Sequence, residues 1–127
     1  MRIDKKSLEL TFAGAFRPLF ISSKKGLIEL RGSRYPIGFY LDIEKIFESV
    51  TYPLKENDCL YLLSDGYVDQ FGGEKNKKLN KANFKELLTT IYEMPIEEQE
   101  AFLEYSFNNW KQDNEQTDDV LVIGIKI

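Results

Sequence analysis

The sequence of 127 residues contains no histidine and only one cysteine, Cys59. The absence of histidine removes an imidazole general acid, so a leaving group would have to be protonated by water or by a carboxylic acid. A single cysteine excludes an internal disulfide, which fits a reducing compartment. Because Cys59 lies within an apolar, strand-like pattern, we expect its side chain to pack in the core.

The sequence also lacks a long apolar run and a basic block. No uninterrupted apolar stretch approaches the roughly 20 residues that cross a bilayer, and residues 1–6 lead into no apolar signal core. Lysine and arginine number 17 against 21 acidic residues, a net charge of −4, which disfavours a nucleic-acid surface. The lysine-rich residues 75–78 are expected to form a solvated loop. We therefore expect a cytoplasmic protein with no membrane segment in this chain and no nucleic-acid partner.

Length and composition are those of one globular domain. Hydrophobic residues make up 43% of the chain and charged residues 30%, as in ordinary soluble proteins. The first half has the alternation and punctuation of a meander of β-strands. The expected strands are residues 8–12, 18–22, 27–30, 46–54 and 59–64, with an irregular loop at residues 32–38.

The second half predicts two helices and a final strand. Apolar residues recur at helical spacing between residues 84 and 91, with Asn80 or Asn83 as the N-cap. A second helix is expected to begin at Pro95, because proline is tolerated in a first turn and the glutamates that follow favour its positive end. Residues 120–127 predict a strand buried on both faces at its start. The expected apolar face of the second helix consists of Ala101, Phe102, Tyr105, Ser106 and Trp110. The fold class is therefore α+β, with largely antiparallel strands.

Two acidic points stand at the ends of expected strands. Asp65 closes the strand at residues 59–64, and Asp118 and Asp119 open the final strand. A carboxylate at a strand end is held by the sheet behind it and faces water, which suits a hard divalent cation. Asp-Gly alone is more typical of a turn, and Asp118-Asp119 alone is compatible with a solvated strand entry. No third acidic point of this kind lies upstream, so the pattern is half of a metal site.

Four segments, in this order, resemble the SpoIIE/RsbU-type branch of the PPM metal-dependent serine/threonine phosphatases. They are residues 12–20, 35–38, 60–72 and 115–124. The resemblance implies that residues 1–127 form a single domain, the C-terminal part of a PPM catalytic domain, and hence part of its α/β/β/α sandwich. In the family, an aspartate-glycine motif on an earlier strand bridges two Mg²⁺ or Mn²⁺ ions, and the resemblance does not include that N-terminal metal motif.

The resemblance also implies roles for the acidic residues. Asp65 and Asp118 match direct ligands of one metal ion, and Asp119 would orient the loop or a metal-bound water. Asp69 would reach an additional, weakly held metal. The implied cofactor is Mn²⁺ or Mg²⁺ in a two-metal centre, which activates water for hydrolysis of phosphoserine or phosphothreonine on a protein. Two carboxylates supply only a fraction of the roughly six oxygens that Mg²⁺ takes, so we expect weak metal binding by this chain alone.

Four further residues are weaker candidates for contact with phosphate. Arg17 and Arg34 lie near glycine loops, although a solvated surface arginine is the ordinary alternative. Gly72 and Gly73 could approach a substrate phosphate together with the lysines that follow, although a mobile surface loop is the ordinary alternative.

Two functions stay open. The first is part of a phosphatase that acts on a bacterial regulatory phosphoprotein, such as an anti-sigma-factor antagonist, after an upstream sensory or helical-repeat domain. As this piece alone, it is expected to be inactive. The second is a non-catalytic regulatory or interaction module on a degenerate phosphatase fold. Because loss of an end strand and two helices would bare a sheet edge and apolar surface, we also expect self-association, for example as a homodimer.

Overall fold

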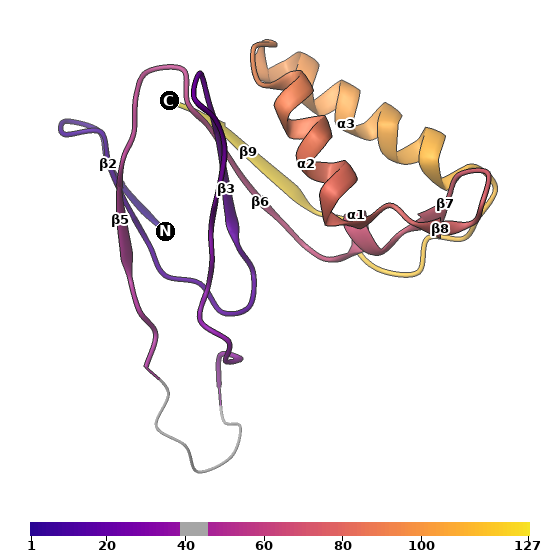
Figure 1. Cartoon of the computed structure of the whole chain (residues 1–127), viewed down its shortest axis with the longest axis horizontal. Coiled ribbons are helices and arrows are strands. Elements are labelled where there is room, and N and C mark those ends of the chain that lie inside the picture. The colour runs from indigo at the N-terminus through magenta and orange to yellow at the C-terminus, as the bar shows by residue number, and fades with distance from the viewer. Residues whose placement is uncertain (39–45) are drawn as a thin grey trace.

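The computed structural model describes residues 1–38 and 46–127. Two antiparallel sheets and a pair of helices form successive layers (Figure 1). The three-stranded sheet has the order β1-β2-β5 and consists of β1 (Arg2–Asp4), β2 (Glu9–Phe12) and β5 (Val50–Pro53). The four-stranded sheet has the order β4-β3-β6-β9 and consists of β3 (Leu19–Ser23), β4 (Gly26–Leu30), β6 (Cys59–Leu63) and β9 (Val122–Lys126).

The remaining elements lie between β6 and β9 in the chain. They are α1 (Gly66–Asp69), β7 (Phe71–Gly72), β8 (Lys77–Lys78), α2 (Asn80–Ile91) and α3 (Ile96–Lys111). The mixed α+β class with antiparallel strands is thus confirmed. Within the described residues no helix is both long and apolar enough to span a membrane.

The strands of the first half lie close to their expected positions, but they do not form one meander. β3 and β4 form a hairpin in one sheet. β2 belongs to the other sheet, where it forms a hairpin with β1, a strand that was not predicted, and also pairs with β5. β5 is also shorter than the strand that was predicted at residues 46–54. Periodicity indicates that a segment is a strand, but it does not indicate which strand will be its partner.

Two apolar clusters hold the layers together. β3 contributes to both, because successive side chains on a strand point to opposite faces. Leu19 and Ile21 belong to the cluster between the two sheets, and Phe20 belongs to the cluster between the four-stranded sheet and the helices. Cys59 is fully buried in the helix-side cluster, so its predicted core position is confirmed. The four-stranded sheet is therefore the central layer, and it carries the ends of β6 and β9.

The helices begin where the sequence indicates. The side-chain oxygen of Asn80 accepts hydrogen bonds from the backbone N–H groups of Ala82 (2.8 Å) and Asn83 (3.1 Å), so Asn80 caps α2. α3 starts directly after Pro95. Both boundaries depend on local backbone chemistry, which explains why they could be read from the sequence.

The expected apolar face of α3 was wrong in part. Phe102 and Trp110 pack partly buried against the core, but Tyr105 is 68% exposed. The residues that α3 buries are Gln99, Leu103 and Phe107. The helix is turned this way because Tyr67 packs its ring 5.2 Å from that of Phe107 and donates its hydroxyl hydrogen bond to the Leu103 carbonyl at 2.8 Å. Gln99 is buried because its side-chain oxygen accepts the Tyr61 hydroxyl at 2.7 Å.

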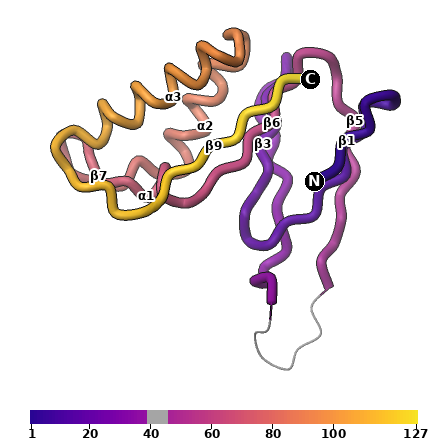
Figure 2. Tube along the Cα trace, turned by 180° about the vertical axis from the view of Figure 1, so that it is seen from behind, coloured from indigo at the N-terminus to yellow at the C-terminus, as the bar shows by residue number. Residues whose placement is uncertain are grey.

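The final strand is an edge strand, so the expectation that its start is buried on both faces was also wrong. β6 pairs with one edge of β9, and no described strand pairs with the other. Ile123 is 44% exposed, and Leu121, just before the strand, is 57% exposed. The rear view in Figure 2 shows β9 running along the outside of β6 beside α3. A β-branched run is therefore compatible with an exposed edge.

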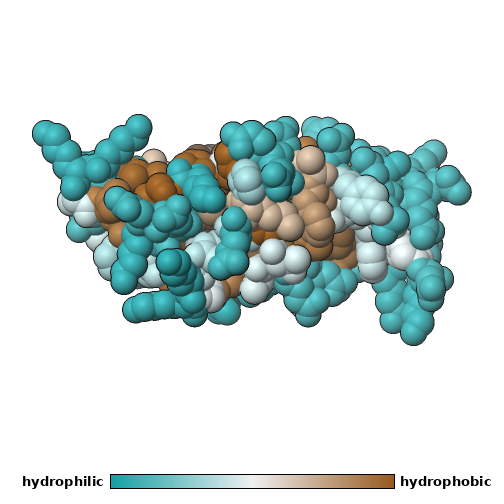
Figure 3. Space-filling view, turned by 90° about the horizontal axis from the view of Figure 1, so that it is seen from above, coloured by the Kyte–Doolittle hydropathy of each residue, from teal (hydrophilic) through white to brown (hydrophobic). Residues whose placement is uncertain are grey.

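We expect this apolar edge to make the chain self-associate. Unpaired backbone groups and exposed aliphatic side chains at a sheet edge template contacts between molecules. In Figure 3, apolar side chains appear between polar ones on the face seen from above. Light scattering should show a mass that rises with protein concentration, and Ile123→Lys should reduce that rise. Ile37→Lys is the control, because Ile37 is 86% exposed on another loop. A wild-type chain that stays monomeric at all concentrations would contradict this prediction.

Candidate metal centre

The two acidic points lie at the same end of the central sheet. β6 and β9 are antiparallel, and Leu63 at the end of β6 pairs with Val122 at the start of β9. Asp65 follows β6 in the chain, and residues 118–119 precede β9. Strand pairing thus brings together acidic segments that are more than fifty positions apart in the sequence.

Ser64 ties these two strand ends to each other. Its hydroxyl donates a hydrogen bond to the Asp119 carbonyl at 2.8 Å and accepts one from the Leu121 N–H at 3.0 Å. Its own N–H donates to the Leu121 carbonyl at 3.0 Å. Our reading of the sequence missed Ser64, although a polar residue in an apolar run just before Asp65 was a signal. Ser64 thus holds the acidic segment that precedes β9 against the end of β6.

Gly66 allows the backbones to approach closely at this point. A Cβ atom on Gly66 would lie 2.4 Å from the Asp119 carbonyl oxygen and 3.3 Å from that of Asp118. Real Cβ atoms do not come within 2.4 Å of a carbonyl oxygen, so this position requires glycine. The glycine of the Asp-Gly pair therefore serves contact between segments as well as the local turn.

Asp65 directly precedes α1, and its side chain makes no helix-capping hydrogen bond. Instead, an Nη atom of Arg17 lies 2.5 Å from its Oδ2 atom. This hydrogen bond is the main cause that holds the pKa of Asp65 below its ordinary value. The Asp65 side chain is 40% exposed, so an ionised carboxylate is accessible from solvent. Arg17 is thus engaged at the candidate centre, whereas Arg34 is an exposed loop residue.

Asp118 and Asp119 form an exposed, locally ordered turn. The Oδ1 atom of Asp118 accepts a hydrogen bond from the N–H of Asp119 at 2.7 Å, and the Asp118 carbonyl accepts one from the Gln116 side chain at 2.9 Å. Gln70 holds the preceding part of the loop, because its buried amide nitrogen donates to the Glu115 carbonyl at 3.0 Å. Gln70 was also missed, since a lone glutamine carries no pattern.

Asp69 lies at the end of α1, where Lys78 forms an ion pair with it at 3.1 Å. Lys78 is in β8, which pairs with β7, so the expectation of a solvated loop at residues 75–78 was wrong at this point. The hairpin also packs on α3: the Gly73 N–H donates to the Trp110 carbonyl at 2.9 Å, and a Cβ on Gly72 would lie 1.8 Å from that oxygen. Close packing, which composition does not reveal, therefore explains these glycines.

The donors present suit a hard divalent cation. The carboxylates of Asp65 and Asp118 offer the oxygen ligands that Mg²⁺ and Mn²⁺ take. Across residues 1–38 and 46–127, however, no three acidic or cysteine side chains are grouped closely enough to hold a metal ion. The structure thus has the acidic segments of Asp65 and Asp118 close together without a complete ligand set.

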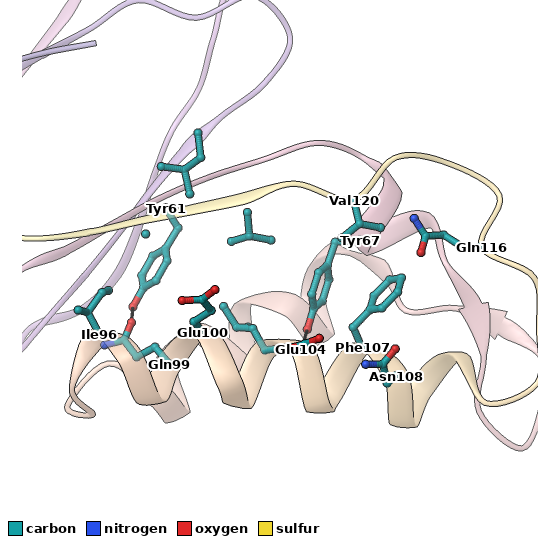
Figure 4. A pocket seen from close by; sticks show the side chains of 14 residues that line it. Tyr61, Tyr67, Ile96, Gln99, Glu100, Glu104, Phe107, Asn108, Gln116 and Val120 are labelled. Atoms are coloured by element: carbon teal, nitrogen blue, oxygen red, sulfur yellow. Dashed lines mark hydrogen bonds between the residues drawn. The ribbon is translucent and has the colours of Figure 1, made fainter.

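A groove between α3 and β9, lined by both polar and apolar side chains, is a separate surface. Tyr61 and Tyr67 reach from the sheet side toward the helix, and Glu100 and Glu104 project from α3 (Figure 4). Neither Asp65 nor Asp118 lines this groove. It is therefore distinct from the candidate metal centre.

Comparison with known proteins shows the family of this chain. The family model described as Stage II sporulation protein E (SpoIIE) matches residues 1–127, the whole chain. The chain belongs to the SpoIIE family. This is a family of PP2C-type phosphatase domains, which are metal-dependent. No match was found among curated proteins.

Solved structures of PP2C domains have the same fold. The SiaA-PP2C domain of Pseudomonas aeruginosa superposes with a TM-score of 0.90 at 27% identity, covering 98% of this chain and 48% of that one. The PP2C phosphatase domain of SpoIIE from Bacillus subtilis, solved with a fragment of its regulatory domain, gives 0.75 at 22% identity, covering 98% and 36%. A manganese-presoaked phosphatase domain of the same protein gives 0.71 at 22%, covering 99% and 53%. The chain therefore spans about half, or less, of the length of these relatives.

Proposed function

We propose that this chain is the C-terminal part of a metal-dependent protein serine/threonine phosphatase domain and that Asp65 and Asp118 are two of its metal ligands. The observation that carries the proposal is the contact between the two acidic strand ends, made by Ser64 and allowed by Gly66. In a chain whose fold and family are those of PP2C domains, this contact assembles hard oxygen donors at one sheet end. The phosphate ester of a protein substrate would approach there.

The residues of this chain would divide the work as follows. Asp65 and Asp118 would hold a divalent cation, Mn²⁺ or Mg²⁺. Asp119, whose carbonyl is tied to Ser64, would keep the turn in place, and Asp69 would contribute to a further, weaker site. A cation held there would neutralise the charge of the phosphate and lower the pKa of the water bound to it. The guanidinium group of Arg17 lies beside Asp65. Arg17 is therefore a candidate contact for the oxygens of the phosphate.

The rest of the domain would complete the ligand set. The relatives extend well beyond the matched portion, and two carboxylates alone are too few for Mg²⁺. We therefore propose that residues 1–127 are one structural unit, that the bridging carboxylate is supplied from outside them, and that the piece alone has little activity. A bacterial regulatory phosphoprotein in the cytoplasm, such as an anti-sigma-factor antagonist, is the proposed substrate, with a sensory or helical-repeat region upstream of the domain.

A non-catalytic interaction module is the second candidate. The pairing of Asp65 with Arg17 and of Asp69 with Lys78 favours it, because both carboxylates already have a cationic partner. In that case the acidic end of the sheet would be a structural ion-pair network. The two candidates differ in whether metal and turnover depend on Asp65.

The test is phosphatase activity of the complete domain on a phosphopeptide in millimolar Mn²⁺. Asp65→Asn and Asp118→Asn should each lower kcat/KM by about a hundredfold or more, since a neutral amide is a far weaker ligand. Asp113→Asn, at another exposed aspartate of the same polar tract, should leave activity within about twofold. A complete domain that is inactive with Mn²⁺ would favour the interaction module. An active domain that is indifferent to both substitutions would show that Asp65 and Asp118 are not its metal ligands.

A further inference from the structure

The contact between Arg17 and Asp65 joins two segments that are 48 residues apart in the chain. The Arg17 side chain is 53% exposed and that of Asp65 is 40% exposed. A half-exposed ion pair adds little to stability, because water competes for both charges. The contact therefore calls for an explanation other than the stability of the fold.

The backbone beneath Arg17 is held by packing between two loops. The Phe16 N–H donates to the Ser33 carbonyl at 2.8 Å, and the Ser33 N–H donates to the Gly14 carbonyl at 2.8 Å. A Cβ on Gly14 would lie 2.8 Å from the Arg17 carbonyl oxygen, and one on Gly32 would lie 3.0 Å from the same atom. Two loops thus close around the backbone of Arg17, which places the start of its side chain beside Asp65.

The second carboxylate of this segment has the same kind of partner. Asp69, at the end of α1, pairs with Lys78 of the β7–β8 hairpin. Lys78 also helps to hold the pKa of Asp65 low, after the larger effect of Arg17. Both carboxylates of the α1 segment are therefore matched by cations that come from elements outside it.

We propose that Arg17 is an internal counter-ion of Asp65, which a divalent cation must displace in order to bind. The proposal rests on the assignment of Asp65 as a metal ligand under the proposed function. A guanidinium within hydrogen-bonding distance uses a carboxylate lone pair that a metal would need, and its positive charge repels the incoming cation. Arg17 would then act as a positioning residue that orients the Asp65 carboxylate while lowering the affinity for metal.

The experiment is titration of the complete domain with Mn²⁺, followed by calorimetry and by the electron paramagnetic resonance signal of free Mn²⁺. Arg17→Gln should bind Mn²⁺ more tightly than the wild type by roughly two- to fivefold, the range expected for one exposed ion pair. The gain should shrink as salt is added, because ions screen the lost charge. Arg17→Lys, which keeps the charge, should stay close to the wild type.

A matched control separates the local contact from net charge. Arg2→Gln removes one positive charge from another exposed arginine, which lies 4.0 Å from Asp4, and should leave Mn²⁺ affinity unchanged. Melting temperatures of all variants would show that each is folded. An equal or lower affinity in Arg17→Gln, an equal gain in Arg2→Gln, or no Mn²⁺ binding by the wild type would overturn the proposal.

Asp65→Asn distinguishes failure of this inference from failure of the proposed function. If Asp65→Asn abolishes Mn²⁺ binding but Arg17→Gln does not strengthen it, Asp65 remains a ligand and only the counter-ion role of Arg17 is wrong. If Mn²⁺ binds equally well to Asp65→Asn, the ligand assignment fails and the inference fails with it. If the complete wild-type domain binds no Mn²⁺, the inference and the ligand assignment both fail.

Discussion

Replacing Gly66 with alanine is expected to lower the free energy of unfolding by about 3 kcal/mol, at the upper end of the usual cost of overpacking. The added Cβ would meet the Asp119 carbonyl oxygen at 2.4 Å and its carbonyl carbon at 2.9 Å. Both are backbone atoms that the hydrogen bond to Ser64 holds in place. The segment at residues 118–119 must therefore move away from α1, which separates the two candidate ligands.

Urea unfolding would measure the loss of stability, and Mn²⁺ titration would measure the expected loss of metal binding. Gly124→Ala is the matched control, since its Cβ would meet side-chain atoms and no backbone: the end of Ile96 at 3.3 Å and the ring of Tyr61 at 3.8 Å. We expect that variant to remain within about 1 kcal/mol of the wild type. Equal stability of Gly66→Ala and the wild type would show that the two strand ends are not packed as described.

Phe84→Ala is expected to destabilise the chain by about 3 to 5 kcal/mol, the usual cost of removing a buried aromatic ring. Phe84 lies on α2, is fully buried, and has its ring 5.0 Å from that of Tyr67 and 6.0 Å from that of Phe20. It joins the helices to the central sheet and to α1. Because Tyr67 is only two residues after Asp65, the cavity should also loosen the position of that carboxylate.

Chemical denaturation of Phe84→Ala beside Tyr105→Ala tests this role. Tyr105 is also a helical aromatic residue, but it is 68% exposed on α3, so its removal should cost no more than about 1 kcal/mol. Similar losses in the two variants would contradict the arrangement of the helix layer. A loss confined to Phe84→Ala would support it.

Local chemistry explains which parts of the fold could be predicted. The strand predicted at residues 59–64 is found at Cys59–Leu63, and Asn80, one of the two predicted caps, caps α2. Both could be predicted because an apolar run and a capping amide act within a few residues. The side of α3 that faces the core was predicted only in part, because Tyr67 and Tyr61 select it from outside the helix. Whether an edge of β9 is exposed depends on which strands pair with it, so this feature was predicted wrongly.

At the candidate metal centre, too, local features could be predicted from the sequence and contacts between segments could not. Asp65 and Asp118 could be selected from the sequence, since each follows or precedes a strand-like run and resembles a ligand position of PPM phosphatases. The sequence by itself determined the family, the fold class and the identity of these carboxylates. Their assignment as ligands stays a prediction that metal titration can test.

Only the tertiary structure decided how these residues meet. Ser64 joins the two strand ends, Gly66 admits the neighbouring backbone, and Arg17 arrives from a loop 48 residues away to pair with Asp65. Motifs and periodicity report interactions within a segment, because propensity and capping involve neighbouring residues. Contacts between segments depend on strand pairing and packing, which no single segment encodes. The sequence thus identifies the carboxylates, and the fold determines that an arginine lies beside one of them.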